Sequence, residues 1–228
     1  MATVVMRPVR QTDAEMAGMS TSRGHGQSPV PSSISSTTTA GVSAVTEARV
    51  GGTDTMASTT LDNGARVVSE HIPGVRSAAV GVWIRQGGAH ESLDDTGASH
   101  LLEHMVFKGT EHRSALEIAD AIEALGGSLD AYTSRETTSY QARVLDEHLP
   151  EALDVLADLV VSPRIAQADL DLEREVVLEE IAQVEDTPDD LVFELHGERL
   201  WGGHPYGRSI LGTKESVGGM PATRLQSL

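Results

Sequence analysis

The sequence predicts an α+β fold in which an antiparallel-rich sheet carries helices packed on one face. Residues 76–86 alternate between apolar and polar side chains, which is typical of a strand with one buried face. Residues 114–127 and 170–185 instead place apolar side chains at helical spacing. Along the chain, strands come first, then two helices, more strands and further helices. This order favours helices gathered against one sheet over regular βαβ alternation.

The first half of the predicted domain contains two strand regions and two helices. Residues 58–72 read as a hairpin around an Asp-Asn-Gly turn, and residues 76–86 form the next strand until two glycines end it. A helix is then expected from Gly97 or Ala98 to about Phe107. The second helix begins at Ser114, whose spacing to Glu117 forms a capping box, and ends at two further glycines.

The second half returns to the sheet and then becomes helical. Two strands are expected first, followed by a helix that Pro163 stops, a long charged helix that ends near Thr187, and a shorter helix. In chain order these segments are residues 128–134, 138–145, 147–161, 170–185 and 189–200.

Residues 1–57 differ in composition from the rest of the chain. They are rich in Ser, Thr, Gly and Pro, so we expect a disordered tail, followed by one domain over residues 58–228. The tail lacks the apolar stretch of a secretory signal. Three arginines among many hydroxyl residues suggest a transit peptide, but the acidic residues of the tail argue against one. We therefore expect a cytoplasmic location, or the mitochondrial matrix if the tail is a transit peptide.

Composition limits the kinds of partner and of metal site. The 228 residues include no Cys, so a zinc ion would have nitrogen and oxygen ligands. The net charge of −17 lies wholly in residues 58–228, which carry 13 basic and 30 acidic residues. This charge argues against nucleic acid and anionic membranes. It favours basic peptides, although an acidic surface that serves solubility explains it equally well.

The segment His100-Leu101-Leu102-Glu103-His104 is the most informative motif. Residues four apart share a helix face, so His100 and His104 can bind one metal ion, and Glu103 lies close enough to reach a water on that ion. This HxxEH order is the inverse of the commoner HExxH order of zinc hydrolases. The alternative is a solvated helix face that carries two histidines by chance.

The predicted helix at residues 170–185 could add a third ligand. Glu173 and Glu180 are two turns apart on one stripe, while Glu175 and Glu179 point elsewhere. Such a stripe could supply one metal ligand and one supporting carboxylate. By itself, a charged solvent face explains these residues better.

Several blocks of sequence resemble the inverzincin zinc peptidases, the family of pitrilysin, insulin-degrading enzyme and the mitochondrial processing peptidases, and most of all its short processing-peptidase branch. The resemblance covers roughly residues 58–217. Its blocks are Leu61 to Gly64, His100 to Thr110, Ala131 to Ser134, Glu173 to Ile181, His204 to Arg208 and Ile210 to Thr213.

The resemblance implies a function and a set of site residues. It implies a zinc metalloendopeptidase in which His100, His104 and Glu180 bind Zn²⁺. Glu180 lies 76 positions after His104, close to the distance at which the family has its third ligand. Glu103 would be the general base and Glu173 a supporting carboxylate, although a surface charge remains the alternative for Glu173. The implied fold is the α/β roll of pitrilysin-like peptidases, here incomplete.

The resemblance also implies a site for an extended peptide at Ala131, Tyr132 and Thr133, which could hold the peptide through backbone hydrogen bonds. The alternative is an ordinary buried strand. His112, His148, His196 and His204 have no ligand spacing with the motif, so we expect surface or structural roles for them.

A partner is expected because similar proteins pair this domain with a second, homologous domain or subunit. Residues 218–228 depart from the usual continuation, so we expect a truncated N-terminal domain that exposes apolar surface. Two functions follow from this. One is an endopeptidase of processing-peptidase type, and the other is a non-catalytic peptide-binding or assembly subunit, or an inactive fragment, that lacks the second half.

Overall fold

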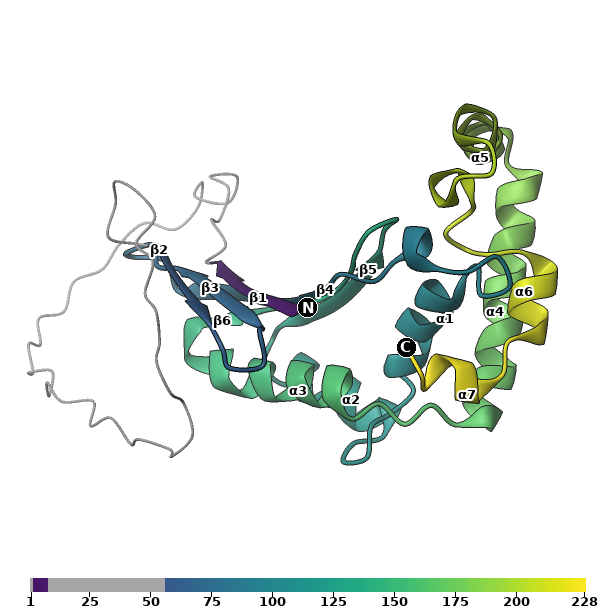
Figure 1. The fold of residues 1–228 in the computed structure, drawn as a ribbon. Helices are drawn as coiled ribbons and strands as arrows, with labels where there is room; N and C mark the ends of the chain where they lie inside the picture. Colours follow the sequence, from purple (N-terminus) through teal and green to yellow (C-terminus); the bar gives the residue numbers. More distant parts are fainter. Residues whose placement is uncertain (1, 8–55) are drawn as a thin grey trace, which may run out of the picture.

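The computed structural model describes residues 2–7 and 56–228, which form a twisted sheet, helices on one of its faces and a helical layer beyond them (Figure 1). The six strands lie in the order β2-β3-β1-β4-β6-β5. All neighbours are antiparallel except β1 and β3. The strands are β1 (Ala2–Arg7), β2 (Met56–Thr60), β3 (Arg66–Glu70), β4 (Ser77–Ile84), β5 (Ser128–Thr133) and β6 (Thr138–Leu145).

The helices account for most of the second half of the chain. Their order confirms the predicted α+β class, with the sheet largely antiparallel and helices α2 and α3 beneath it (Figure 1). The helices are α1 (Ala98–Val106), α2 (Ala115–Glu123), α3 (Leu149–Val161), α4 (Gln167–Asp186), α5 (Pro188–Trp201), α6 (Lys214–Gly219) and α7 (Ala222–Leu225), with short 3₁₀ turns η1 (Gly88–His90), η2 (Asp146–His148) and η3 (Pro205–Gly207).

The N-terminal segment departs from the prediction. Residues 2–7, which we expected to be disordered, pair with β3 on one side and with β4 on the other. A run of Thr, two Val and Met is apolar and β-branched enough to complete a sheet, although it lies in a polar segment. Strand β2 also begins at Met56, two residues before the predicted boundary. The remainder of the expected tail lies outside the described residues.

The apolar core has two parts that meet at α1. One part joins the sheet to α2 and α3 and includes Val106 of α1. The other joins α1 to α4, α6 and α7, and includes Leu101 and Met105 of α1. Because apolar side chains cover α1 on both sides, its position is fixed between the sheet and α4.

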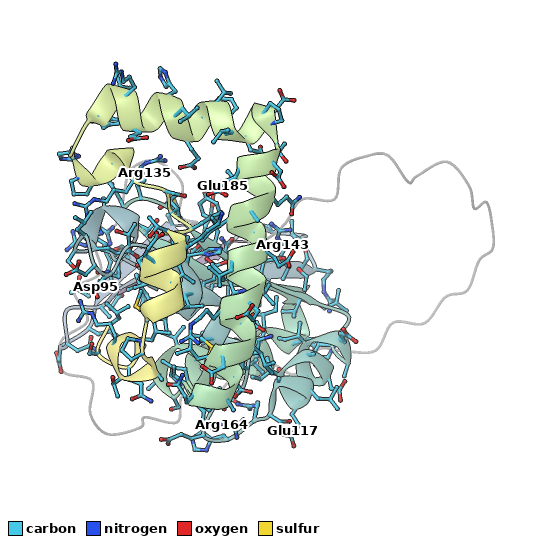
Figure 2. The ribbon with its side chains drawn as sticks, turned by 90° about the vertical axis from the view of Figure 1, so that its right-hand side faces the viewer. Asp95, Glu117, Arg135, Arg143, Arg164 and Glu185 are labelled. Carbon is cyan, nitrogen blue, oxygen red and sulfur yellow. The ribbon has the colours of Figure 1, made fainter. Side chains whose placement is uncertain are left out.

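Helix α5 lies across the end of α4 and buries none of its residues (Figure 2). The turn between the two helices begins at Thr187, as predicted, and Glu185 near that junction pairs with Lys214 of α6 at 2.5 Å. Large apolar side chains of α5 remain exposed, namely Val192, Phe193, Leu195, Leu200 and Trp201. Among the described residues, no helix has both the length and the apolar character that a membrane span requires.

Candidate metal centre

Helices α1 and α4 bring two histidines and one glutamate to a common point. His100 and His104 lie one turn apart on α1, with their ring centroids 4.7 Å apart. Nε2 of His100 lies 3.7 Å from one carboxylate oxygen of Glu180, and Nε2 of His104 lies 3.8 Å from the other. One ligand atom from each residue lies within 4.8 Å of the other two. The three residues that the resemblance to zinc peptidases implied as ligands are therefore together.

The donor set fits a zinc ion. Two imidazole nitrogens and one carboxylate oxygen are typical of catalytic zinc sites, and bonds of about 2.0–2.2 Å around a tetrahedral ion place ligand atoms roughly 3 to 4 Å apart. Burial, and then the neighbouring His104, lower the pKa of His100 to about 4. His100 is therefore neutral near pH 7, as a metal ligand must be.

Glu173 and Lys108 support His104 on the side of the ring opposite to Glu180. Nδ1 of His104 lies 3.1 Å from a carboxylate oxygen of Glu173, and the other oxygen of Glu173 lies 2.5 Å from Nζ of Lys108. The side chain of Glu173 is only 10% exposed, so its charge requires such partners. A carboxylate on Nδ1 fixes the ring and its tautomer and leaves Nε2 free to bind a metal. Glu173 thus has a contact that a surface charge would lack.

Glu103 lies on the same helix as the two histidines and faces the sheet. The hydroxyl of Thr133, on β5, donates a hydrogen bond to one of its carboxylate oxygens. Burial raises the pKa of Glu103, while the bond from Thr133 and the proximity of His104 act in the opposite direction. A carboxylate with a raised pKa, held beside a candidate metal centre, is suited to accept and return a proton.

The start of α1 is held by contacts from outside the helix. The buried carboxylate of Glu91 accepts hydrogen bonds from the backbone N–H groups of Gly97, at 2.8 Å, and Ser99, at 2.7 Å. A negative charge at this position also complements the helix dipole. Gly97 has φ +92°, and a Cβ there would lie 2.6 Å from the carbonyl oxygen of Leu211. The backbone before α6 therefore packs directly against the first turn of α1.

Strand β5 lies at one end of the strand order and, among the described strands, pairs with β6 alone. Thr133 is buried and contacts Glu103, Ala131 is half-buried, and the side chain of Tyr132 is exposed. The predicted peptide-binding residues thus lie on an open sheet edge that runs into the candidate centre. The alternative, an ordinary strand inside the sheet, would be paired with another strand on each side.

Sequence reasoning missed two of the polar contacts. Lys108 lies four residues after His104, so its position on the same face as the second histidine could have been noticed. The hydrogen bond between Thr133 and Glu103 joins residues that are 30 positions apart in the sequence, so no local sequence pattern predicts it. Within the described part of the chain, no metal-binding group includes His112, His148, His196 or His204.

Comparison with known proteins relates the chain to one family of peptidases. A sequence profile of insulinase (peptidase family M16) matches residues 66–214. An uncharacterized zinc protease of Mycobacterium leprae is 50% identical over 169 residues, which are 74% of this chain and 38% of the relative. A protein of Arabidopsis thaliana named a probable mitochondrial-processing peptidase subunit beta is 41% identical over 74% of this chain and 32% of its own length.

A solved structure agrees with these relatives. The crystal structure of a protease from Helicobacter pylori superposes with a TM-score of 0.73 and 25% identity, over 75% of this chain and 42% of that one. The chain therefore spans between about a third and about two fifths of the length of these relatives.

Proposed function

Because the chain belongs to the insulinase family of peptidases (peptidase family M16), we propose that it carries the zinc site of an endopeptidase that hydrolyses extended peptides. The observation that carries this proposal is the convergence of His100, His104 and Glu180 within 4.8 Å, beside a half-buried glutamate. Homologues named zinc proteases support zinc as the metal.

The proposed chemistry divides between the metal and Glu103. Zinc held by His100, His104 and Glu180 would supply a Lewis acid that acidifies water and polarises a carbonyl oxygen. Glu103 accepts the proton of the attacking water and returns it to the leaving amine. Thr133 fixes the carboxylate of Glu103 through one oxygen, and Glu173 holds His104 through Nδ1.

We propose that the peptide binds as an added strand along β5, over Ala131 to Thr133. An extended peptide can satisfy the unpaired backbone groups of a sheet edge and gain orientation from them. The edge ends at Thr133, which contacts Glu103, so a peptide paired with β5 would pass the candidate centre. The net charge of −17 supports basic peptides as the preferred class.

We further propose that a second, homologous domain or subunit closes over the bound peptide. Two observations support this partner: the relatives are more than twice as long as the matched segment, and apolar side chains of α5 are exposed. Without that partner, we expect the 228-residue chain to hydrolyse peptides only weakly.

The experiment compares the chain with its Glu103→Gln variant. Both are loaded with zinc and incubated with a quenched basic peptide, and the products are identified by mass spectrometry. We expect cleavage by the wild-type chain to stop when a chelator is added, and to be about 10² to 10⁴ times slower in Glu103→Gln, because the proton acceptor is lost. Glu175→Gln, on the exposed face of α4, is the matched control and should behave as wild type.

The zinc content of Glu103→Gln is also measured, because it distinguishes loss of the proton acceptor from loss of the metal. Glu103→Gln should retain its zinc, because Glu103 is outside the ligand set. Cleavage by the wild-type chain that is no faster than cleavage by Glu103→Gln would overturn the peptidase proposal for this chain and would favour a peptide-binding role. Loss of zinc in Glu103→Gln would instead contradict its assignment as the proton acceptor.

A further inference from the structure

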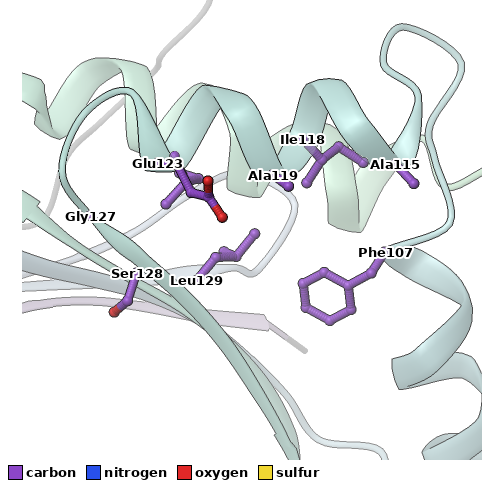
Figure 3. A pocket seen from close by; sticks show the side chains of 9 residues that line it. Phe107, Ala115, Ile118, Ala119, Glu123, Gly127, Ser128 and Leu129 are labelled. Carbon is purple, nitrogen blue, oxygen red and sulfur yellow. The ribbon is translucent and has the colours of Figure 1, made fainter.

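A cavity of about 460 Å³ lies between α2 and the beginning of β5 (Figure 3). Two buried isoleucines of α2, Ile118 and Ile122, form its roof, and Phe107 at the end of α1 closes one side. Its volume falls within the range of sites for small organic groups, about 300–1,000 Å³. The rest of the lining includes Ala119, Glu123 and Leu129.

This cavity and the candidate metal centre lie on the same face of the same edge strand. Side chains alternate along β5, and the odd-numbered residues Leu129, Ala131 and Thr133 are the more buried set, which packs toward the helices. Thr133 contacts Glu103, whereas Leu129 lines the cavity. At about 3.3 Å per residue, the two positions are roughly 13 Å apart.

A peptide added to this edge would follow the same alternation. Residues directly opposite each other in paired strands point to the same face. The peptide residues opposite Thr133 and Leu129 would therefore both point toward the helices, and four positions along the peptide would separate them. The first would lie beside Glu103 and the second at the mouth of the cavity.

We propose that this cavity is a distal subsite that binds an apolar side chain of the peptide, four residues from the position opposite Thr133. The inference rests on the proposed function, because it takes β5 as the peptide-binding edge. The lining explains the preference: it is mainly aliphatic and aromatic, and Glu123, an exposed residue of α2, is the only charged group in it. An acidic side chain would be repelled by Glu123, whereas Leu, Met or Phe would be desolvated against Ile118 and Ile122.

The test uses peptides whose register is fixed by the metal. Each peptide carries a hydroxamate, which chelates zinc, and a single Leu placed one to six residues from it in an otherwise Ala and Ser sequence. The dissociation constant is measured by calorimetry with the zinc-loaded 228-residue chain. We expect the affinity to be highest when Leu is about four residues from the chelating group. That peptide should bind about tenfold more tightly than a peptide without Leu.

Two variants of α2 show whether the cavity causes that peak. Ala119 is exposed and lines the cavity, so Ala119→Phe should fill it and remove the peak without disturbing the core. Ala124 is also exposed at the end of α2 but is not part of the lining, so Ala124→Phe should keep the peak. The melting temperature of both variants is measured, and Ala119→Leu, a smaller change, should weaken the peak in part.

The outcomes distinguish this inference from the proposed function. If the hydroxamate peptide without Leu binds, but affinity does not depend on the position of Leu, the subsite is wrong and the metal site stands. Equal peaks in Ala119→Phe and Ala124→Phe would likewise overturn it. If no hydroxamate peptide binds the zinc-loaded chain, the proposed function fails and the subsite fails with it.

Discussion

At the scale of single residues, the candidate centre depends on contacts behind its ligands as much as on the ligands. Lys108 contacts Glu173 at 2.5 Å, and Glu173 contacts Nδ1 of His104 at 3.1 Å. A nearly buried carboxylate that lost its cation would retain His104 as a partner but would be less firmly held. Lys108 is therefore a positioning residue for His104.

Replacing Lys108 tests that role. We expect Lys108→Met to weaken zinc binding by about tenfold, within the range that follows from the loss of groups that orient metal ligands. Lys108→Arg, which keeps the positive charge, should recover most of the affinity. Zinc affinity is measured by competition with a chromogenic chelator. Equal affinities for the wild-type chain and Lys108→Met would show that Lys108 does not support His104.

The sequence was most informative at this scale where the pattern is local. The HxxEH spacing predicted a shared helix face for His100 and His104, and the structure confirms it. The two-turn spacing of Glu173 and Glu180 placed both carboxylates on one stripe of α4 but by itself favoured a charged solvent face. In the structure both carboxylates reach the histidines. The contacts of Thr133 could not be predicted, because they depend on the packing of β5 against α1.

At the scale of elements, a glycine allows the loop before α6 to pack against the start of α1. Gly97 adopts φ +92° and leaves no room for a Cβ beside Leu211, so the loop before α6 can approach the helix that carries the motif. Gly126, after α2, also has a positive φ of +65°, but a Cβ there would meet nothing within 4 Å. A side chain at either position would strain the backbone, but only at Gly97 would it also clash with a neighbouring segment.

Alanine at these two positions should have unequal effects. We expect Gly126→Ala to cost roughly 1 kcal/mol of unfolding free energy, the penalty for a left-handed conformation. Gly97→Ala should cost roughly 3 kcal/mol or more, because the clash with a backbone carbonyl adds to the same penalty. Urea denaturation measures both values. Similar costs for the two variants would mean that the contact with Leu211 is unimportant.

The loop between α1 and α2 is tied to α3 by a buried carboxylate. Asp158 accepts hydrogen bonds from Thr110 at 2.7 Å and from Arg113 at 2.6 Å. Burial acts to raise the pKa of Asp158, but these two hydrogen bonds and the charge of Arg113 outweigh it, so the pKa is lower than in the unfolded chain. Ionised Asp158 therefore stabilises the folded state.

This depressed pKa predicts a dependence of stability on pH. The stabilisation is fully present above the pKa of an unfolded Asp, about 3.9, and is lost as the pH falls through the lower folded value. The difference in unfolding free energy between the wild-type chain and Asp158→Asn should shrink as the pH falls below about 4. A difference that stays the same down to pH 3 would contradict this account.

The order of most elements was predictable, whereas strand β1 and the short helices α6 and α7 were not predicted. Period-two and helical patterns predicted the hairpin, β4, β5, β6 and the helices α1 to α5 within a few residues. Strand β1 was missed because its neighbours in sequence are polar, and only pairing with β3 and β4 identifies it. This pairing joins segments that are far apart in the sequence, so the composition of residues 2–7 and their neighbours does not predict it.

At the scale of the whole molecule, α1 joins two cores. One lies under the sheet and the other lies against α4, and the candidate ligands come from α1 itself and from α4. A zinc ion held by His100, His104 and Glu180 would link α1 to α4 and stabilise the folded chain, by about 2.7 kcal/mol at a free zinc concentration 100 times the dissociation constant.

The zinc content of the purified chain tests the central claim most directly. After dialysis against a weak chelator, metal analysis should give one zinc per wild-type chain and per Glu175→Gln control, and much less in His104→Ala and Glu180→Gln. Zinc should also raise the melting temperature of the wild-type chain but not of those two variants. A wild-type chain without zinc, or variants that retain one zinc per chain, would contradict the assignment of these three residues as its ligands.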